Sequence, residues 1–241
     1  MCNRGCIEFG TERLSREEVA GKHVLEVGAY DHNGSLRSVV EALEPASYKG
    51  VDLFVGPGVD EICDAGDVLE RFGPDAFDVV ICTELLEHMN DWQRGIHNLK
   101  AVLKPQGVLI LTTRSRGFPY HGYPYDFWRF ELDDFAAIFD DFAVASLEPD
   151  PLEPGVMLKA CKPEAWAERD LSSYEVYSIV TGKHATRVKP REILMLKLSY
   201  TPWRLVKRLL PSSALPVLRR TLARFGSLGR FYPSGGPTRR P

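Results

Sequence analysis

The stretch HVLEVGAYDHNGS, residues 23–35, decides the fold. Its first half, His23 to Gly28, is a mostly apolar run that predicts a buried strand ending in a turn. Residues 35–43 predict a helix, because apolar side chains recur there at helical spacing. A buried strand, a loop with small residues and a helix therefore follow one another within about twenty residues.

The same alternation continues through residue 161. Further strands are expected at residues 48–53, 77–82 and 108–113, further helices at 65–72, 92–103 and 133–139, and a closing antiparallel pair at 143–147 and 156–161. Continuous apolar strands separated by helices predict an α/β fold with a mostly parallel, Rossmann-like sheet covered by helices on both faces. Ligands of such sheets bind beyond the carboxyl ends of the strands, which here are residues 28–35, 52–53, 63–67 and 82–88.

Four regions are expected along the chain. Residues 1–22 form an N-terminal helical cover, 23–162 the ligand-binding domain, 163–232 a helical basic extension and 233–241 a disordered tail. Within the extension, helices are expected from Leu171 to Val180 and from Glu192 to Leu198.

Charge is unevenly distributed. Residues 1–150 hold 13 Lys and Arg against 27 Asp and Glu, whereas residues 151–241 hold 17 against 6. Between Trp203 and Phe225, basic and apolar residues alternate in two short amphipathic pieces separated by prolines. This segment either packs on the acidic body of its own chain or makes peripheral contact with an anionic membrane. Nucleic acid is not expected as a partner, because the segment contains no recognisable binding module.

The overall composition is that of a globular protein, with 44% hydrophobic and 26% charged residues among 241. The longest apolar runs are too short to span a bilayer, and no charged-then-apolar leader precedes Cys6, so we expect a cytoplasmic protein. Its five cysteines lack the spacing of a zinc site and are expected to be free thiols.

The loop after the first strand bears on the ligand. Small residues there allow close approach of the backbone, and Gly34 and Ser35 lead into a helix N-terminus with free N–H groups. A dinucleotide-binding enzyme would place G-x-G-x-x-G at this position, and that motif is absent. Glu26 and Asp31 would repel a pyrophosphate, so the loop favours a ligand with an ammonium group over a nicotinamide dinucleotide.

Glu26-x-Gly28 resembles the first motif of the class I S-adenosylmethionine-dependent methyltransferases, in which E/D-x-G-x-G-x-G surrounds the methionine part of the cofactor. Here Tyr30 replaces the middle glycine, so we expect its side chain to lie along the cofactor. The resemblance extends to residues 77–84, which match the family's fourth strand, and to Leu103-Lys104-Pro105-Gln106-Gly107, which matches its turn into the fifth.

The resemblance implies a set of residues that bind S-adenosyl-L-methionine. Asp52 would accept hydrogen bonds from both ribose hydroxyls and Leu53 would lie against adenine, while Asp64 and the N–H of Ala65 would contact the adenine edge. The full set comprises Glu26, Gly28, Tyr30, Gly34, Ser35, Asp52, Leu53, Asp64, Ala65, Thr83 and Glu84.

Glu84-Leu85-Leu86-Glu87-His88 follows the third apolar strand and supplies the candidate catalytic residues, His88 and Glu87. In a helix, Glu84, Glu87 and His88 would share one face, and His88 has the intrinsic pKa of a base at neutral pH. The pattern resembles E-x-x-E-H of ubiquinone-pathway O-methyltransferases, in which these residues can ligate magnesium. Three alternatives stay open here: His88 as base, a Mg²⁺ site at these three residues, and a purely structural role.

The stretch His121-Gly-Tyr-Pro-Tyr-Asp-Phe-Trp-Arg-Phe130 lies at the same end of the sheet and predicts an aromatic lid. Similar segments occur in small methyltransferases of glycan and natural-product synthesis. Tyr123, Tyr125, Asp126 and Arg129 are therefore the candidate contacts to the acceptor, and Phe127 and Phe130 are expected in the core.

The sequence thus predicts an enzyme that transfers a methyl group to a hydroxyl of a sugar, a glycan or a related small metabolite. N-methylation of an amino sugar or small amine is the alternative within the class. A non-catalytic binding module that has kept the fold is the alternative outside it, since Tyr30 departs from the motif.

Overall fold

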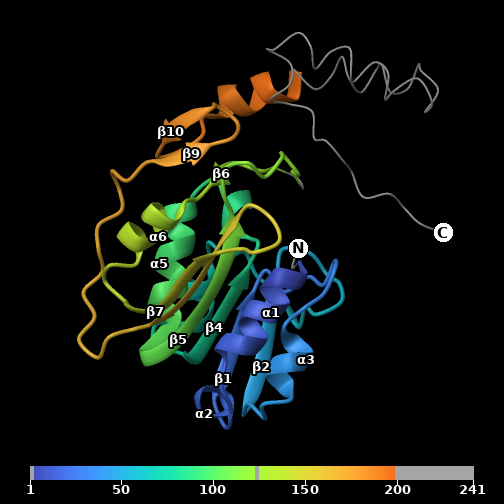
Figure 1. Cartoon of the computed structure of the whole chain (residues 1–241), viewed down its shortest axis with the longest axis vertical. Helices are drawn as coiled ribbons and strands as arrows, with labels where there is room; N and C mark the ends of the chain where they lie inside the picture. The colour runs from blue at the N-terminus through green and yellow to red at the C-terminus, as the bar shows by residue number, and fades with distance from the viewer. Residues whose placement is uncertain (1–2, 123–124, 199–241) are drawn as a thin grey trace, which may run out of the picture.

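The computed structural model describes residues 3–122 and 125–198. Within them a central sheet has the order β3-β2-β1-β4-β5-β8-β7 (Figure 1). Its strands are β1 (His23–Val27), β2 (Ser47–Asp52), β3 (Glu61–Ile62), β4 (Phe77–Thr83), β5 (Leu103–Arg114), β7 (Ala143–Pro149) and β8 (Gly155–Cys161). Strands β1 to β5 are parallel, and β8 runs antiparallel to both β5 and β7. The predicted parallel sheet and its closing antiparallel pair are confirmed.

Helices cover both faces of this sheet because successive strand residues point to opposite sides. In β4, Val79 and Ile81 pack in a cluster that includes residues of the first three helices, α1 (Arg4–Arg13), α2 (Arg16–Val19) and α3 (Arg37–Glu41). Val80 and Cys82 pack in the opposite cluster, with α4 (Val68–Phe72), α5 (Trp92–Val102) and α6 (Leu132–Ile138). The fold is that of a three-layer α/β sandwich.

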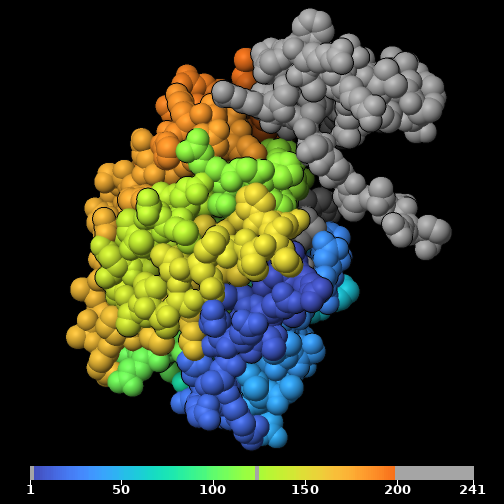
Figure 2. Space-filling view, viewed as in Figure 1, coloured from blue at the N-terminus to red at the C-terminus, as the bar shows by residue number. Residues whose placement is uncertain are grey.

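The predicted N-terminal cover is helical. Asn3 caps α1 by accepting a hydrogen bond from the N–H of Cys6, and its amide nitrogen donates to Asp150 Oδ2 at 2.8 Å. At the other end of α1, Arg13 pairs with Glu148 at 2.9 Å. Figure 2 shows this segment lying against the residues of β7 and β8. The cover is therefore bound to the far, antiparallel edge of the sheet as well as to its face.

A second, smaller sheet lies beyond the carboxyl ends of the main strands (Figure 1). It consists of β6 (Trp128–Arg129), β9 (Val176–Ser178) and β10 (Lys183–Ala185), all antiparallel. The helix predicted from Leu171 to Val180 is wrong, because the backbone of β9 pairs with β6 and β10 instead. Residues 190–198 are helical, in agreement with the helix expected from Glu192 to Leu198.

The basic segment from Trp203 to Phe225 and the tail at 233–241 lie outside the described residues. None of the helices that the structure describes is long and apolar enough to cross a membrane. Cys6, Cys63, Cys82 and Cys161 form no disulfide in the part of the chain that the structure describes.

A buried lysine joins the two helices beside the smaller sheet. Lys100 of α5 is fully buried, and its Nζ donates hydrogen bonds to the carbonyl oxygen of Ile138 at 2.7 Å and to Asp141 at 2.6 Å. The rings of Phe139 and Phe142 enclose the ammonium group at 4.8 and 5.4 Å. Lys104, by contrast, pairs with Asp78 where both side chains are partly exposed.

These two lysines provide a matched test of what burial does to an ion pair. Lys100→Met should lower the free energy of unfolding by about 3–5 kcal/mol, because it leaves the buried Asp141 without its cation. Lys104→Met should lower it by no more than about 1 kcal/mol. Urea unfolding followed by circular dichroism measures both, and equal losses would contradict the assignment of Lys100 to the core.

Candidate active site

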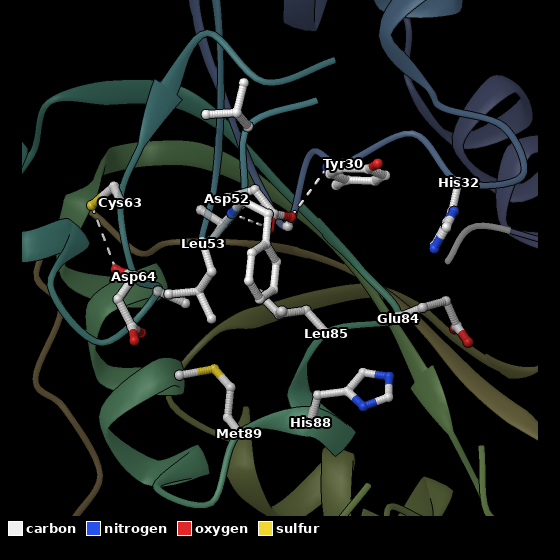
Figure 3. A pocket seen from close by; sticks show the side chains of 15 residues that line it. Tyr30, His32, Asp52, Leu53, Cys63, Asp64, Glu84, Leu85, His88 and Met89 are labelled. Atoms are coloured by element: carbon white, nitrogen blue, oxygen red, sulfur yellow. Dashed lines mark hydrogen bonds between the residues drawn. The ribbon is translucent and has the colours of Figure 1, made fainter. Parts of the chain in front are cut away.

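A pocket of about 360 Å³ opens at the carboxyl ends of β1 to β4 (Figure 3). It is lined by Val27, Gly28, Tyr30, His32, Asp52, Leu53, Phe54, Val55, Cys63, Asp64, Ala65, Glu84, Leu85, His88 and Met89. The lining comes from the loops that the sequence analysis singled out, because parallel strands bring their carboxyl ends to one edge of the sheet.

Tyr30 forms one wall of the pocket without filling it. Its ring packs so closely on Gly56 that a Cβ there would lie 2.2 Å from the ring. Its backbone N–H donates to Asp52 Oδ2 at 3.1 Å. Gly56 therefore makes room for the aromatic residue that replaces the middle glycine of the motif, and the pocket stays open.

The two aspartates of the pocket are held by backbone donors. Besides Tyr30, the N–H of Phe54 donates to Asp52, at 3.2 Å from Oδ1, and the N–H of Gly66 donates to Asp64 Oδ1 at 2.7 Å. Asn98 fixes the next residue by donating to the carbonyl oxygen of Ala65. Both carboxylates keep free lone pairs, so they can accept further hydrogen bonds from a ligand.

Seven of the predicted cofactor residues line the pocket: Gly28, Tyr30, Asp52, Leu53, Asp64, Ala65 and Glu84. The other four do not: Glu26, Gly34, Ser35 and Thr83. Glu26 is 3% exposed within the sheet, and its carboxylate accepts a hydrogen bond from the hydroxyl of Tyr48 at 2.7 Å. Burial raises the pKa of Glu26 to about 7. The carboxylate of Glu26 is thus engaged by Tyr48 and does not line the pocket.

Glu84 corrects the prediction of a common helical face. It has a left-handed backbone, with φ of 54°, and precedes the short 3₁₀ helix η1 (Leu86–His88), so it is not on the same turn as Glu87 and His88. Its side chain points away from His88 (Figure 3) and forms a buried ion pair with Arg114. Thr112 Oγ1 also donates to it, at 3.0 Å. The predicted trio for Mg²⁺ does not converge, because Arg114 holds Glu84.

A different trio does converge. Glu87, His88 and His121 bring their ligating atoms within 4.8 Å of one another. Glu87 Oε1 is 3.8 Å from Nε2 of His88 and 3.7 Å from Nε2 of His121, and the two imidazole rings meet edge to face. His88 Nδ1 donates to the carbonyl oxygen of Tyr125 at 2.6 Å, which leaves the lone pair on Nε2.

The electrostatics of this cluster follow from burial of one carboxylate among imidazoles. Glu87 is fully buried, and although burial alone would raise its pKa, the neighbouring His121 and His88 hold that pKa below its usual range. Burial opposes protonation of His121, but Asp126 and Glu87 outweigh it and raise the pKa of His121 to about 9. The two imidazoles thus favour the charged form of Glu87.

Asp126 and Arg129 are not on the pocket wall, which corrects their predicted contact with the acceptor. Both are buried, and they form a two-pronged ion pair at 2.5 and 2.6 Å. Asp126 Oδ2 also lies 2.9 Å from Nδ1 of His121. The pair therefore orients His121. Tyr123 lies outside the described residues, and the partly buried Tyr125 has Lys197 above its ring at 4.9 Å.

The aromatic residues of this segment anchor it to the core. Phe127 and Phe130 are buried, as expected. Trp128 is buried too, and its indole N–H donates to the carbonyl oxygen of Met89 at 2.7 Å.

Sequence reasoning missed His121 as a member of the site. It stands 33 residues after His88, with a strand between them, so no local spacing connects the two. The only signal was a second histidine at the start of the aromatic segment. His32, Cys63 and Leu85 lie within the predicted loops but were not named as contacts. Val27, Phe54, Val55 and Met89 lie just outside those loops and were missed, because they are apolar neighbours of predicted residues.

A sheet of this order, with one antiparallel strand next to the edge, a pocket at the carboxyl ends and acidic residues after β2 and β3, defines the class I methyltransferase fold. Residues 5–142 match the family described as "Methyltransferase domain", and the chain belongs to that family.

The relatives support the same family. A ubiquinone biosynthesis O-methyltransferase of Coxiella burnetii is 34% identical over 43% of this chain and 48% of its own length. One of Chromobacterium violaceum is 32% identical over 41% and 47%. The chain thus spans about half the length of these relatives.

Solved structures agree on the fold. A Burkholderia thailandensis 1,6-didemethyltoxoflavin-N1-methyltransferase with bound S-adenosylhomocysteine superposes with a TM-score of 0.53 at 16% identity, over 66% of this chain and 78% of that one. The [4+2]-cyclase SpnF superposes with a TM-score of 0.50 at 17% identity, over 65% and 80%.

The raised pKa of Glu26 predicts a pH-dependent contribution to stability. Because the folded state binds this proton more tightly than an unfolded chain with the ordinary pKa of 4.5, the free energy of unfolding falls as pH rises from 4.5 to about 7. The loss amounts to about 3 kcal/mol at most. Glu26→Gln keeps an acceptor for Tyr48 and removes this dependence.

Urea unfolding of the wild-type chain and the Glu26→Gln variant at pH 5, 6, 7 and 8 measures the effect. The variant should gain stability relative to the wild type as pH rises, with most of the gain complete by about pH 8. A difference between the two that stays constant with pH would show that folding does not raise the pKa of Glu26.

Proposed function

We propose that the chain transfers a methyl group from S-adenosyl-L-methionine to a hydroxyl of a small molecule. The observation that carries this proposal is one pocket with Asp52 and Asp64 along one side and the Nε2 of His88 on the other. The curated relatives are named as O-methyltransferases, which is consistent with it.

The pocket residues fit the cofactor by their chemistry. Asp52 offers two carboxylate oxygens to the ribose hydroxyls, Leu53 an apolar face to adenine, and Asp64 an acceptor to the adenine amino group. Gly28 has φ of 86°, which lets the backbone of the loop turn beside the ligand. The bound cofactor supplies an electrophilic methyl group on a sulfonium, and the acidic lining suits its positive charge.

His88 is placed to remove the proton of the acceptor hydroxyl. Its Nδ1–H is committed to the carbonyl oxygen of Tyr125, so the basic nitrogen is Nε2. The side chain is 15% exposed and lines the pocket, so an acceptor can reach it. Much of the remaining catalysis would come from holding two reactants in line.

The rim of the pocket favours an acceptor with an apolar or aromatic body. Phe54 and Val55, to which no cofactor contact was assigned, are about half exposed or more beside the pocket. Asp126 and Arg129, which would have bound sugar hydroxyls, are buried in their own ion pair. A sugar or glycan acceptor therefore has less support than a phenol-like hydroxyl. Contact of the basic segment with a membrane would suit an acceptor dissolved in lipid, but the segment lies outside the described residues.

Binding of the cofactor is the first prediction of this proposal. S-adenosylmethionine at 100 times its dissociation constant should stabilise the chain by about 2.7 kcal/mol, which raises the thermal midpoint by several degrees. NAD at the same concentration should produce no shift. Asp52→Ala should remove most of the shift, whereas His184→Ala, an exposed residue of β10, should retain it. No shift with S-adenosylmethionine at millimolar concentration would favour a non-catalytic binding module.

The role of His88 is the second prediction. His88→Ala should lower the rate of transfer from labelled S-adenosylmethionine to a phenolic acceptor by about 10²–10⁴-fold, because the hydroxyl proton then lacks an acceptor. Transfer to an unprotonated amine needs no such base and should be little affected. The shift caused by S-adenosylhomocysteine serves as the control for an intact pocket. Equal activity of the variant and the wild type would favour N-methylation, the alternative within the class.

A further inference from the structure

We propose that Glu87, His88 and His121 form a binding site for a divalent first-row transition metal ion, of which Zn²⁺ is one. The site lies at the end of the pocket where His88 is, beneath the segment that begins at His121. The site includes His121, which is not part of the E-x-x-E-H pattern, and it excludes Glu84, which is.

The first argument is an unpartnered carboxylate oxygen. Glu87 is fully buried, and its Oε1 has no hydrogen-bond partner among the described residues. A buried charged oxygen in that condition is costly. Two nitrogen atoms lie near it, at 3.7 and 3.8 Å, which is too far for hydrogen bonds. One ion bonded at about 2.0–2.2 Å to each ligand needs ligand atoms within about 4 Å of one another, so these atoms, which lie within 4.8 Å, would close slightly around an ion. An ion between these three groups would satisfy the oxygen.

The second argument is that each ligand is already oriented through its other polar atom. His88 Nδ1 donates to the carbonyl oxygen of Tyr125 at 2.6 Å. The carboxylate of Asp126 accepts a hydrogen bond from the backbone N–H of His121 at 2.9 Å and lies 2.9 Å from its Nδ1, an ion-pair contact without hydrogen-bond geometry. Glu87 Oε2 accepts a hydrogen bond from Thr113 Oγ1 at 2.8 Å. Metal-binding histidines are characteristically held in this way by a carbonyl or a carboxylate, and an ion at Nε2 of His121 would displace the proton bound there.

This orientation is itself supported from behind. Arg129 binds both oxygens of Asp126, and it also donates to the carbonyl oxygens of Phe118 and Pro119. The carboxylate that faces His121 is therefore fixed on all sides. Thr113 sits on β5, so the support of Glu87 comes from the sheet itself.

The ligand types select the metal. Two imidazoles and one carboxylate suit zinc, iron, cobalt or nickel, whereas magnesium prefers carboxylate oxygens and water. With Glu84 held by Arg114, only one carboxylate remains at the site. The three protein ligands occupy only three coordination positions of the ion, so at least one position remains for water or a substrate.

The metal and the proposed base use the same lone pair of His88. In the metal-bound protein, His88 would act as a ligand, and the ion would supply the chemistry of lowering the pKa of a bound hydroxyl. The proposal concerns metal binding and stands whether or not the chain transfers methyl groups.

Metal binding by the whole chain, freed of metal by a chelator and then dialysed, tests the proposal. Co²⁺ is the probe, because its visible absorption reports histidine and carboxylate coordination, and Zn²⁺ should displace it. We expect one Co²⁺ per chain and binding at least about 100-fold tighter than that of Mg²⁺. His121→Ala should weaken Co²⁺ binding by at least about 100-fold and Glu87→Gln by a similar factor.

Two further variants separate the site from the surface and from folding defects. Thr113→Val removes only the hydroxyl behind Glu87 and should weaken binding by about 10-fold. His184→Ala removes an exposed histidine far from the cluster in sequence and should leave the affinity unchanged. Circular dichroism of each metal-free variant verifies that it folds.

The proposal is overturned if the wild-type chain binds no Co²⁺ or Zn²⁺, or if Mg²⁺ binds as tightly. Binding that survives His121→Ala would also overturn it, because the ion would then be held elsewhere. In the first case the cluster would be a network of charges in which a protonated His121 bridges Glu87 and Asp126. These results do not depend on S-adenosylmethionine, whose binding is measured separately, so failure of either proposal can be distinguished from failure of the other.

Discussion

The burial of the Glu87 carboxylate is the constraint on which the arrangement of the site depends. A charged group without solvent must be satisfied by its neighbours, and here the neighbours come from separate parts of the chain. Thr113 approaches from β5 and His121 from the aromatic segment, while His88 is the next residue of η1 itself. The carbonyl oxygen of Glu87 also accepts a hydrogen bond from the N–H of Phe127 at 2.7 Å. The 3₁₀ helix η1 thus binds the aromatic segment through Glu87 and Phe127.

A second buried charge network extends this arrangement to the N-terminus. Arg114, at the end of β5, pairs with Glu84 and lies near Asp150 and Glu153 in the turn between β7 and β8. Asn3, at the start of α1, donates to the same two acidic residues. The guanidinium of Arg114 therefore connects the pocket wall with the turn between the antiparallel strands. Asn3 connects the same turn with the helical cover. This explains why Glu84, although adjacent to the catalytic candidates, serves the scaffold.

The elements of the fold could be predicted because their signals are local. The strand at His23–Val27 and the order of the later elements follow from apolar runs and helical spacing. The helix expected at Leu171–Val180 was wrong because β9 is stabilised by pairing with strands that are distant in sequence. The pocket loops were predictable for a similar reason: their position depends on the sheet alone.

The roles of individual polar residues were harder to predict, because they depend on which charge lies opposite. Asp126 and Arg129 are three residues apart and neutralise one another. Glu26 follows the family motif, yet it binds the hydroxyl of Tyr48 from the neighbouring strand. His121 lies beside His88 only because the chain folds back over the end of the sheet after β5. Sequence spacing identifies which residue types are available at the edge of the sheet, and the tertiary structure decides how they pair.

The fold does not determine which reaction is catalysed. The side chains at the two ends of the pocket indicate the reaction. SpnF has a similar fold and is named a cyclase, so the sheet alone does not specify methyl transfer. In this chain, Asp52 and Asp64 form an acidic end, and His88 forms an end with a basic nitrogen. A donor with ribose hydroxyls and an adenine amino group suits the first end, and a group that must lose a proton suits the second. This arrangement agrees with the proposed transfer to a hydroxyl, because the imidazole can accept the proton that a hydroxyl loses on methylation.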